Sequence, residues 1–208
     1  MPSGFYGKLA QLSDLGRSLI GRLLDLELDV PLKDTLKQHG ISFTSVETGT
    51  NNCDAAHGFL EARREKLFVF LGFDGNIVSP SILSFVMKSL HIHDGYVRAF
   101  KGSTTNYYGI LAEDPIGAAV IFLTENLDSG PVLHRQTFPR PDDPELINYF
   151  IDPGLCARVL RDTLIKLDKM PRLLEEAEPV AGGETYFIIH QVLKHLAILE
   201  YEMEQQSG

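Results

Sequence analysis

Residues 90–102 read LHIHDGYVRAFKG, and residues 117–133 read GAAVIFLTENLDSGPVL. In the first stretch two histidines, His91 and His93, alternate at the end of an apolar run. In the second stretch Asp128 stands in a turn bounded by Gly130, after another apolar run. Because α/β proteins build their sites where strands end, these two stretches predict that His93 and Asp128 converge in one site.

The overall composition limits the classes of protein to which the chain can belong. It has 208 residues, 44% of them hydrophobic, which is enough for one domain with a buried core. The formal net charge of -9 and the absence of any lysine or arginine run argue against nucleic acid as a partner. No apolar run reaches membrane-spanning length and the N-terminus lacks a signal-peptide pattern, so we expect no membrane contact and a cytoplasmic location.

The two cysteines, Cys53 and Cys156, form no CxxC pair. This spacing fits a reduced compartment, and we interpret both as small packed side chains rather than nucleophiles.

Strand-like and helix-like segments alternate along the chain. Residues 67–71, LFVFL, form a continuous apolar run that is typical of a parallel strand covered on both faces. Residues 152–170 are predicted to form an amphipathic helix with one apolar face, made of Leu155, Val159, Leu160, Leu164 and Leu167. Further helices are predicted at 4–15, 31–39, 55–64, 80–88 and 191–204, and further strands at 18–24, 41–46, 89–93, 118–123 and 132–138.

This alternation predicts an α/β fold with a mostly parallel sheet and helices on both faces. The core is expected to span residues 1–175. The tail, residues 176–208, holds a short strand-like segment and a helix. It is interpreted either as an accessory piece that grips substrate or forms a homodimer, or as a helix that covers the sheet.

The segment from Leu67 to Leu133 resembles the catalytic core of the folate-dependent formyltransferases, which include the glycinamide ribonucleotide, methionyl-tRNA and nucleotide-sugar enzymes. Their pattern is a strand ending Asn-x-His, a loop reaching a Gly, and a later strand leading into Leu-Asp-x-Gly-Pro-Ile/Val. LHIHDGYVRAFKG occupies the first block, with His93 and Gly102 at the matching positions, and LDSGPVL matches the second nearly letter for letter. Upstream, LGFDGNIVSP is similar to the segment that walls the folate site, and KGSTTNYYGIL is similar to a loop of the amino-sugar branch. Both blocks in order are a specific signal, and the resemblance implies a Rossmann-like fold.

The resemblance implies transfer of a formyl group from the co-substrate 10-formyltetrahydrofolate to a primary amine of a small molecule. An amino sugar or its nucleotide-linked form is the expected acceptor, and the acidic balance disfavours transfer RNA. The transfer passes through a tetrahedral intermediate with a developing oxyanion. A histidine can bond that oxyanion or shuttle the amine proton, and a carboxylate favours the protonated imidazole and collects the proton. The implied catalytic residues are His93, Asp128 and His91.

The resemblance also implies two sets of binding residues and no metal. The predicted folate contacts are Phe73, Asp74, Ile77, Leu123, Glu125 and Asn126. The predicted substrate contacts are Arg98, Lys101, Gly102, Asn106 and Tyr107.

The sequence departs from the family pattern in three places. His91 stands where the family has Asn, whose amide binds the formyl oxygen, and an imidazole has another shape and can carry a charge. The family prolines are missing from residues 94–98. The family's opening strand is expected to be short or absent, because the chain starts with MPSGFYGK close to the first turn.

Two other interpretations stay open at this point. Residues two apart on a strand face the same side, so His91, His93 and Asp128 also form a two-histidine, one-carboxylate set of the kind that binds iron or zinc. Alternatively, the change from Asn to His91 marks a relative that binds a ligand or partner without turnover. Bound metal would favour the first, and activity created by His91→Asn would favour the second.

Overall fold

A computed structural model of the chain describes residues 30–45, 54–65, 67–72, 77–84, 88–96, 100–141, 144–180 and 182–207. The helices are α3 (Leu32–Gln38), α4 (Asp54–Glu61), α5 (Pro80–Ser84), α6 (Thr105–Leu111), α7 (Asp152–Lys169) and α8 (Gln191–Ser207), with the short helical segments η1 (Pro144–Leu146), η2 (Ile147–Ile151) and η3 (Pro171–Glu175). The strands are β1 (Phe68–Phe70), β2 (Ser89–His93), β3 (Phe100–Gly102), β4 (Ile116–Phe122), β5 (Val132–Phe138) and β6 (Glu184–Tyr186).

The central sheet has four described strands in the order β1-β2-β4-β5. β1 pairs with β2 in parallel, whereas β4 is antiparallel to both of its neighbours. Three of the four strands therefore run in one direction and β4 runs against them, which makes the sheet mixed. β3 and β6 form a separate parallel pair.

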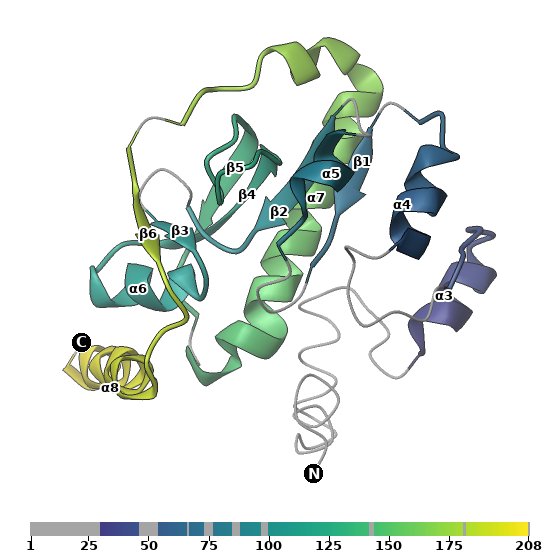
Figure 1. Cartoon of the computed structure of the whole chain (residues 1–208). Coiled ribbons are helices and arrows are strands. Elements are labelled where there is room, and N and C mark those ends of the chain that lie inside the picture. The colour runs from purple at the N-terminus through teal and green to yellow at the C-terminus, as the bar shows by residue number, and fades with distance from the viewer. Residues whose placement is uncertain are drawn as a thin grey trace.

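Helix α7 packs along one face of this sheet, against β2, β4 and β5. Figure 1 shows α7 passing behind the strands, with α3 and α4 beyond the β1 edge. The contact is apolar, and its buried members are Leu90, Ile92, Ala118, Val120, Leu133, Val159 and Leu167. Burial at roughly 25 cal/mol per Å² of apolar surface makes this layer a main source of stability.

A second apolar cluster joins α6, η2 and α8. Its buried members are Tyr107, Ile110, Ile116, Ile147, Ile151, Ile189, Ala197 and Ile198. In Figure 1 the α8 helix lies beside α6, away from the central sheet. The tail therefore contributes side chains to the same packed interior as the residues before it, and α8 packs on a helix rather than on the sheet.

The sequence predicted most described elements. The α/β class is confirmed, as are the strands at 89–93, 118–123 and 132–138 and the helices at 31–39, 55–64, 152–170 and 191–204. The helix expected at 80–88 is described only over Pro80–Ser84, and the segments expected at 4–15 and 18–24 lie outside the described residues. The described residues contain no helix that combines the length and apolar character needed to cross a bilayer.

Three expectations were wrong. Residues 41–45 form no strand, because their side chains are exposed and no described strand lies beside them to pair with. β1 is not covered on both faces, since Val69 and the following Leu71 are exposed at what is an edge of the described sheet. Leu164 is not part of the apolar face of α7, because its side chain is exposed. Thr163 is buried instead, and the Thr163 hydroxyl donates to the Val159 carbonyl.

Candidate active site

The strand β2 places both of its histidines on the face of the sheet that α7 does not cover. Leu90 and Ile92 point into the apolar layer beneath α7. Because side chains alternate along a strand, His91 and His93 project from the opposite face. In the register of the sheet they lie opposite Ile121 and Ala119 of β4.

His93 is held in one orientation by its surroundings. Its side chain is only 2% exposed, and its Nε2 lies 3.3 Å from the carbonyl oxygen of Phe100. A carbonyl oxygen only accepts, so Nε2–H must donate this hydrogen bond. Its Nδ1 then faces Oδ2 of Asp128 at 3.6 Å, the distance of an ion pair when His93 is protonated.

Asp128 reaches His93 from the loop between β4 and β5. Its backbone has φ 44°, a left-handed conformation that Asp tolerates better than most residues. The carboxylate is buried and accepts a hydrogen bond of 2.9 Å from the backbone N–H of Gly102. Gly102 itself has φ 100°, and a Cβ there would overlap the Tyr186 carbonyl, so this donor position requires glycine.

His91 is fixed in the same way as His93. Its Nδ1 lies 3.3 Å from the Phe70 carbonyl oxygen, so Nδ1–H donates to the neighbouring strand β1. Burial lowers the pKa of His91 below its ordinary value, although the Phe70 carbonyl opposes the shift. The imidazole is therefore neutral near pH 7.

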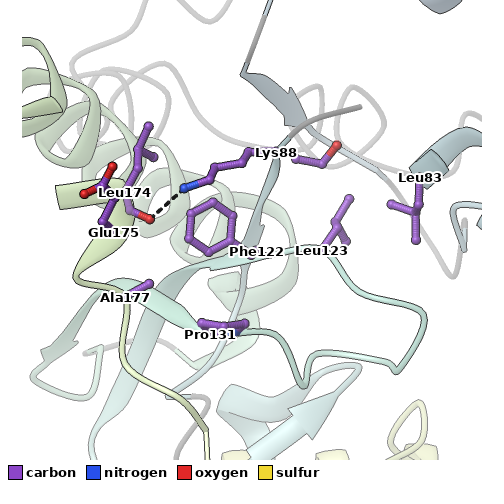
Figure 2. A pocket seen from close by; sticks show the side chains of 9 residues that line it. Leu83, Lys88, Phe122, Leu123, Pro131, Leu174, Glu175 and Ala177 are labelled. Atoms are coloured by element: carbon purple, nitrogen blue, oxygen red, sulfur yellow. Dashed lines mark hydrogen bonds between the residues drawn. The ribbon is translucent and has the colours of Figure 1, made fainter. Parts of the chain in front are cut away.

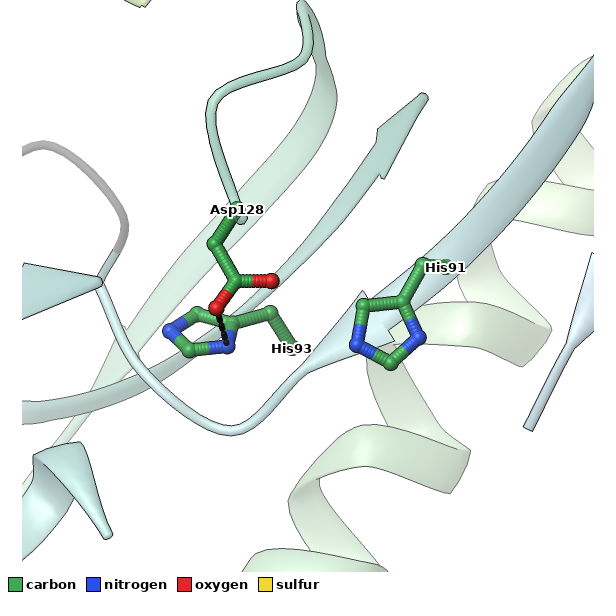
Figure 3. A group of neighbouring side chains, drawn as sticks. All are labelled: His91, His93 and Asp128. Carbon is green, nitrogen blue, oxygen red and sulfur yellow. Dashed lines mark ion pairs between the residues drawn. The ribbon is translucent and has the colours of Figure 1, made fainter. Parts of the chain in front are cut away.

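The three predicted catalytic residues come together in one cluster. One ligand atom from each of His91, His93 and Asp128 lies within 4.8 Å of the others. Figure 3 shows the second ring nitrogen of His91 turned toward His93 and Asp128. The sequence therefore predicted this meeting of side chains from residues far apart in the chain.

Asp94 is a further acidic group at this site that the sequence pattern did not single out. Its Oδ1 lies 3.8 Å from Nδ1 of His93, and 38% of its side chain is exposed. Burial of the carboxyl group raises the pKa of Asp94, and the adjacent His93 opposes that rise. Its place directly after His93 in the sequence is the signal that could have revealed it.

The predicted folate contacts are spread over two segments. Phe73 and Asp74 lie outside the described residues, and Ile77 beside them is 67% exposed. Glu125 and Asn126 are exposed on the loop that carries Asp128.

Leu123 is half-buried at the start of that loop and lines a pocket of about 440 Å³ (Figure 2). Lys88 also lines this pocket, with its Nζ donating to the Leu174 carbonyl at 3.1 Å. The pocket lies where β2 begins and β4 ends, whereas His93 is the last residue of β2.

Two predicted substrate contacts have structural roles instead. The amide of Asn106 is buried and bonds the backbone N–H and carbonyl of Gly117 and the carboxyl group of Asp152. Tyr107 is fully buried in the cluster that joins α6 to α8. The cause of both errors is that residues 105–111 form helix α6 rather than the expected loop, so these side chains point into the protein.

The other predicted substrate contacts lie near Asp128 or outside the described residues. Gly102 donates its N–H to Asp128. Lys101 precedes it on β3 and is buried opposite Thr185 of β6. Arg98 belongs to a part of the chain that the structure does not describe.

Comparison with known proteins gives a likeness in structure rather than in sequence. No protein-family model and no curated protein matches the sequence. A variant of HypX from Aquifex aeolicus is similar with a TM-score of 0.57 and 17% identity, over 84% of this chain and 32% of that one. The chain thus spans about a third of the length of HypX.

Two further solved structures match over most of their own length. The formyltransferase PseJ from Anoxybacillus kamchatkensis, in complex with a UDP-linked formamido sugar and tetrahydrofolate, has a TM-score of 0.53 and 16% identity, over 75% of this chain and 79% of that one. A sugar N-formyltransferase from a Shewanella species has a TM-score of 0.50 and 16% identity, over 94% and 83%. The chain therefore shares its fold with the formyltransferases, the sugar N-formyltransferases included.

Proposed function

We propose that the protein transfers a formyl group from 10-formyltetrahydrofolate to the primary amine of a small molecule. The observation that carries this proposal is the buried pair of His93 and Asp128, 3.6 Å apart and each held by a backbone hydrogen bond. This pair sits on the fold of enzymes that transfer formyl groups.

The two side chains supply the proton transfers that the reaction needs. The amine nitrogen attacks the formyl carbon, which creates an oxyanion and a positively charged nitrogen. The Nδ1–H of protonated His93, on the side of the ring that faces Asp128, donates a hydrogen bond to the oxyanion. Asp128 stabilises that imidazolium and accepts the amine proton. When the carbon–N10 bond breaks, the electron pair and a proton go to N10, and tetrahydrofolate leaves.

We further propose an amino sugar or its nucleotide-linked form as the acceptor. Two observations support this choice: the likeness in sequence of residues 103–111 to the amino-sugar branch, and the sugar N-formyltransferases among the similar structures. The exposed Glu125 and Asn126 and the half-buried Leu123 are the described residues that we propose contact the folate.

The test is an assay of tetrahydrofolate release. Purified protein is incubated with 10-formyltetrahydrofolate and a panel of free and UDP-linked amino sugars. We expect turnover with at least one amine, and a loss of about 10²- to 10⁴-fold in the His93→Ala and Asp128→Asn variants. His134→Ala is the matched control, because His134 lies on the α7 side of the sheet beside Lys166.

The outcomes distinguish a formyltransferase from a protein that binds a ligand without catalysis. Turnover that survives in the His93→Ala variant would contradict the proposed mechanism. Absence of turnover across the panel, with tetrahydrofolate still bound in a calorimetric titration, would favour a ligand-binding protein without catalysis. Absence of both would overturn the proposal.

A further inference from the structure

The hydrogen bonds of His91 and His93 determine which ring nitrogens face the centre of the cluster. Each imidazole donates one N–H to a backbone carbonyl, at Phe70 and at Phe100. In a neutral ring the second nitrogen carries a lone pair, and it points away from the carbonyl that the first nitrogen bonds. His93 directs this nitrogen at Asp128, and His91 turns its own toward the same pair (Figure 3).

Three electron-pair donors therefore lie within 4.8 Å of one another. Two neutral imidazole nitrogens and a carboxylate oxygen repel one another unless a positive charge lies between them. A proton on His93 supplies that charge in the proposed formyl transfer. A metal ion would supply it at all three atoms at once.

The ligand types and their supports match those of transition-metal sites. Metal-binding histidines usually donate the second ring N–H to a carbonyl or carboxylate, as both rings do here. Metal–ligand bonds of about 2.1 Å in a tetrahedral site place neighbouring ligand atoms about 3.4 Å apart. The 3.6 Å between His93 and Asp128 is close to this value, and the half-buried His91 needs a small side-chain movement to reach it.

We propose that His91, His93 and Asp128 bind one divalent transition-metal ion such as Zn²⁺. The two neutral imidazoles and one carboxylate are a ligand set that Zn²⁺ and Fe²⁺ accept, with coordination positions left open. Asp94, 3.8 Å from His93 on the same side, adds a second negative charge that balances the dication. Binding uses the Nδ1 electron pair of His93, so the metal-bound form excludes the protonated His93 of the proposed transfer.

The experiment measures metal binding without folate or amine. The full chain is treated with a chelator, dialysed, and titrated calorimetrically with Zn²⁺ in the presence of a weak competing ligand. We expect one ion per chain, with affinity lowered at least about 10- to 100-fold in His91→Asn and Asp128→Asn. The control His134→Ala should bind as the wild type does.

A second measurement reports the ligands themselves. Co²⁺ added in place of Zn²⁺ should give a visible absorption spectrum that changes in His91→Asn, and circular dichroism checks that this variant is folded. Equal Zn²⁺ affinity in wild type and His91→Asn, or no saturable site, would overturn the metal site. Because the titration contains no folate, its failure leaves the formyl-transfer assay untouched, and the reverse also holds.

Discussion

At the scale of single residues, the site depends on a tight turn directly after His93. A Cβ added to Gly95 would overlap Oγ1 of Thr105 and come within 2.9 Å of Nε2 of His93. The Thr105 hydroxyl donates to the Asp94 carbonyl, so this contact belongs to the same turn. Glycine is therefore needed at position 95 for space rather than for backbone freedom.

We predict that Gly95→Ala displaces Thr105 and the His93 ring. Overpacking of this kind costs about 1–3 kcal/mol of folding stability, and a shift of about 1 Å at a catalytic group lowers activity about 100-fold. Denaturant unfolding and the formyl-transfer assay measure the two effects.

Gly58→Ala is the matched control for this prediction. Gly58 lies in α4, and outside that helix's own backbone and the two chain neighbours no atom of the described residues comes within 4 Å of the added carbon. The change should therefore stabilise the protein by about 0.5–1 kcal/mol. Wild-type activity in Gly95→Ala would show that the His93 ring is not held by this turn.

At the scale of elements, a buried polar junction links α6, β4 and α7. Asn106 of α6 bonds the Gly117 backbone of β4 and donates to Asp152 at the start of α7, 2.7 Å away. Burial, and next the nearby charge of Asp94, raise the pKa of Asp152 well above its ordinary value. The folded chain thus keeps a proton on Asp152 at pH values where the unfolded chain has lost it.

The raised pKa of Asp152 in the folded chain gives a prediction for the pH dependence of stability. Above the unfolded pKa of 3.8, stability attributable to Asp152 falls as pH rises toward the raised folded pKa, by about 1.4 kcal/mol for each pH unit that separates the two pKa values. Asp152→Asn keeps an oxygen that accepts from Asn106 and carries no charge. It should match the wild type in acid and become the more stable of the two as pH rises.

Urea unfolding of both proteins between about pH 4 and about pH 8 measures this difference. A wild type that gains stability over Asp152→Asn with rising pH would contradict a raised pKa. Asn106→Ala provides a comparison, since it leaves the buried carboxyl group without its donor and should destabilise the protein at every pH.

The same elements show how far the sequence predicts the fold. The apolar pattern located β2, β4, β5 and α7: β4 is a continuous apolar run, and α7 carries an apolar face at helical spacing. The prediction failed at α6, because the resemblance of KGSTTNYYGIL to a loop of the amino-sugar branch led us to expect a loop there. The helix forms because Tyr107 and Ile110 are buried against α8, a contact between distant segments that no local pattern reveals.

The cluster of His91, His93 and Asp128 was predictable for a different reason. The resemblance to a known motif joined His93 to Asp128, although the two residues lie in different segments of the chain. What it did not reveal was Asp94 or the inward-facing Asn106, since both depend on how the turn after β2 and the start of α6 are placed.

At the scale of the whole molecule, the C-terminal segment stabilises the side of the protein that bears the site. Ile198 of α8 is 7% exposed within the cluster that includes α6, whereas Leu196 on the same helix is 49% exposed. The Thr104 hydroxyl before α6 also accepts a hydrogen bond from the Ile189 backbone N–H. Formation of a homodimer by the tail stays a prediction.

We predict that Ile198→Asp destabilises the protein by about 3 kcal/mol or more, because it buries an unpaired carboxylate. Leu196→Asp introduces the same residue on the exposed side of the helix and should change stability by no more than about 0.5 kcal/mol. Chemical unfolding of the two variants makes the comparison, and equal losses would contradict the packing of α8 on α6.

The reversed direction of β4 determines how Asp128 reaches His93. β4 ends at Phe122, which is near Leu90 at the beginning of β2, about 10 Å along the strand from the level of His93. The loop after β4 must therefore run back over the sheet for Asp128 to reach His93. The Phe122 N–H donates a hydrogen bond to the Pro131 carbonyl, which joins the two ends of this loop. The His93 imidazole is thus carried by β2 and the Asp128 carboxylate by the loop between β4 and β5. The length of that loop sets the distance between the two groups without any change in the strands.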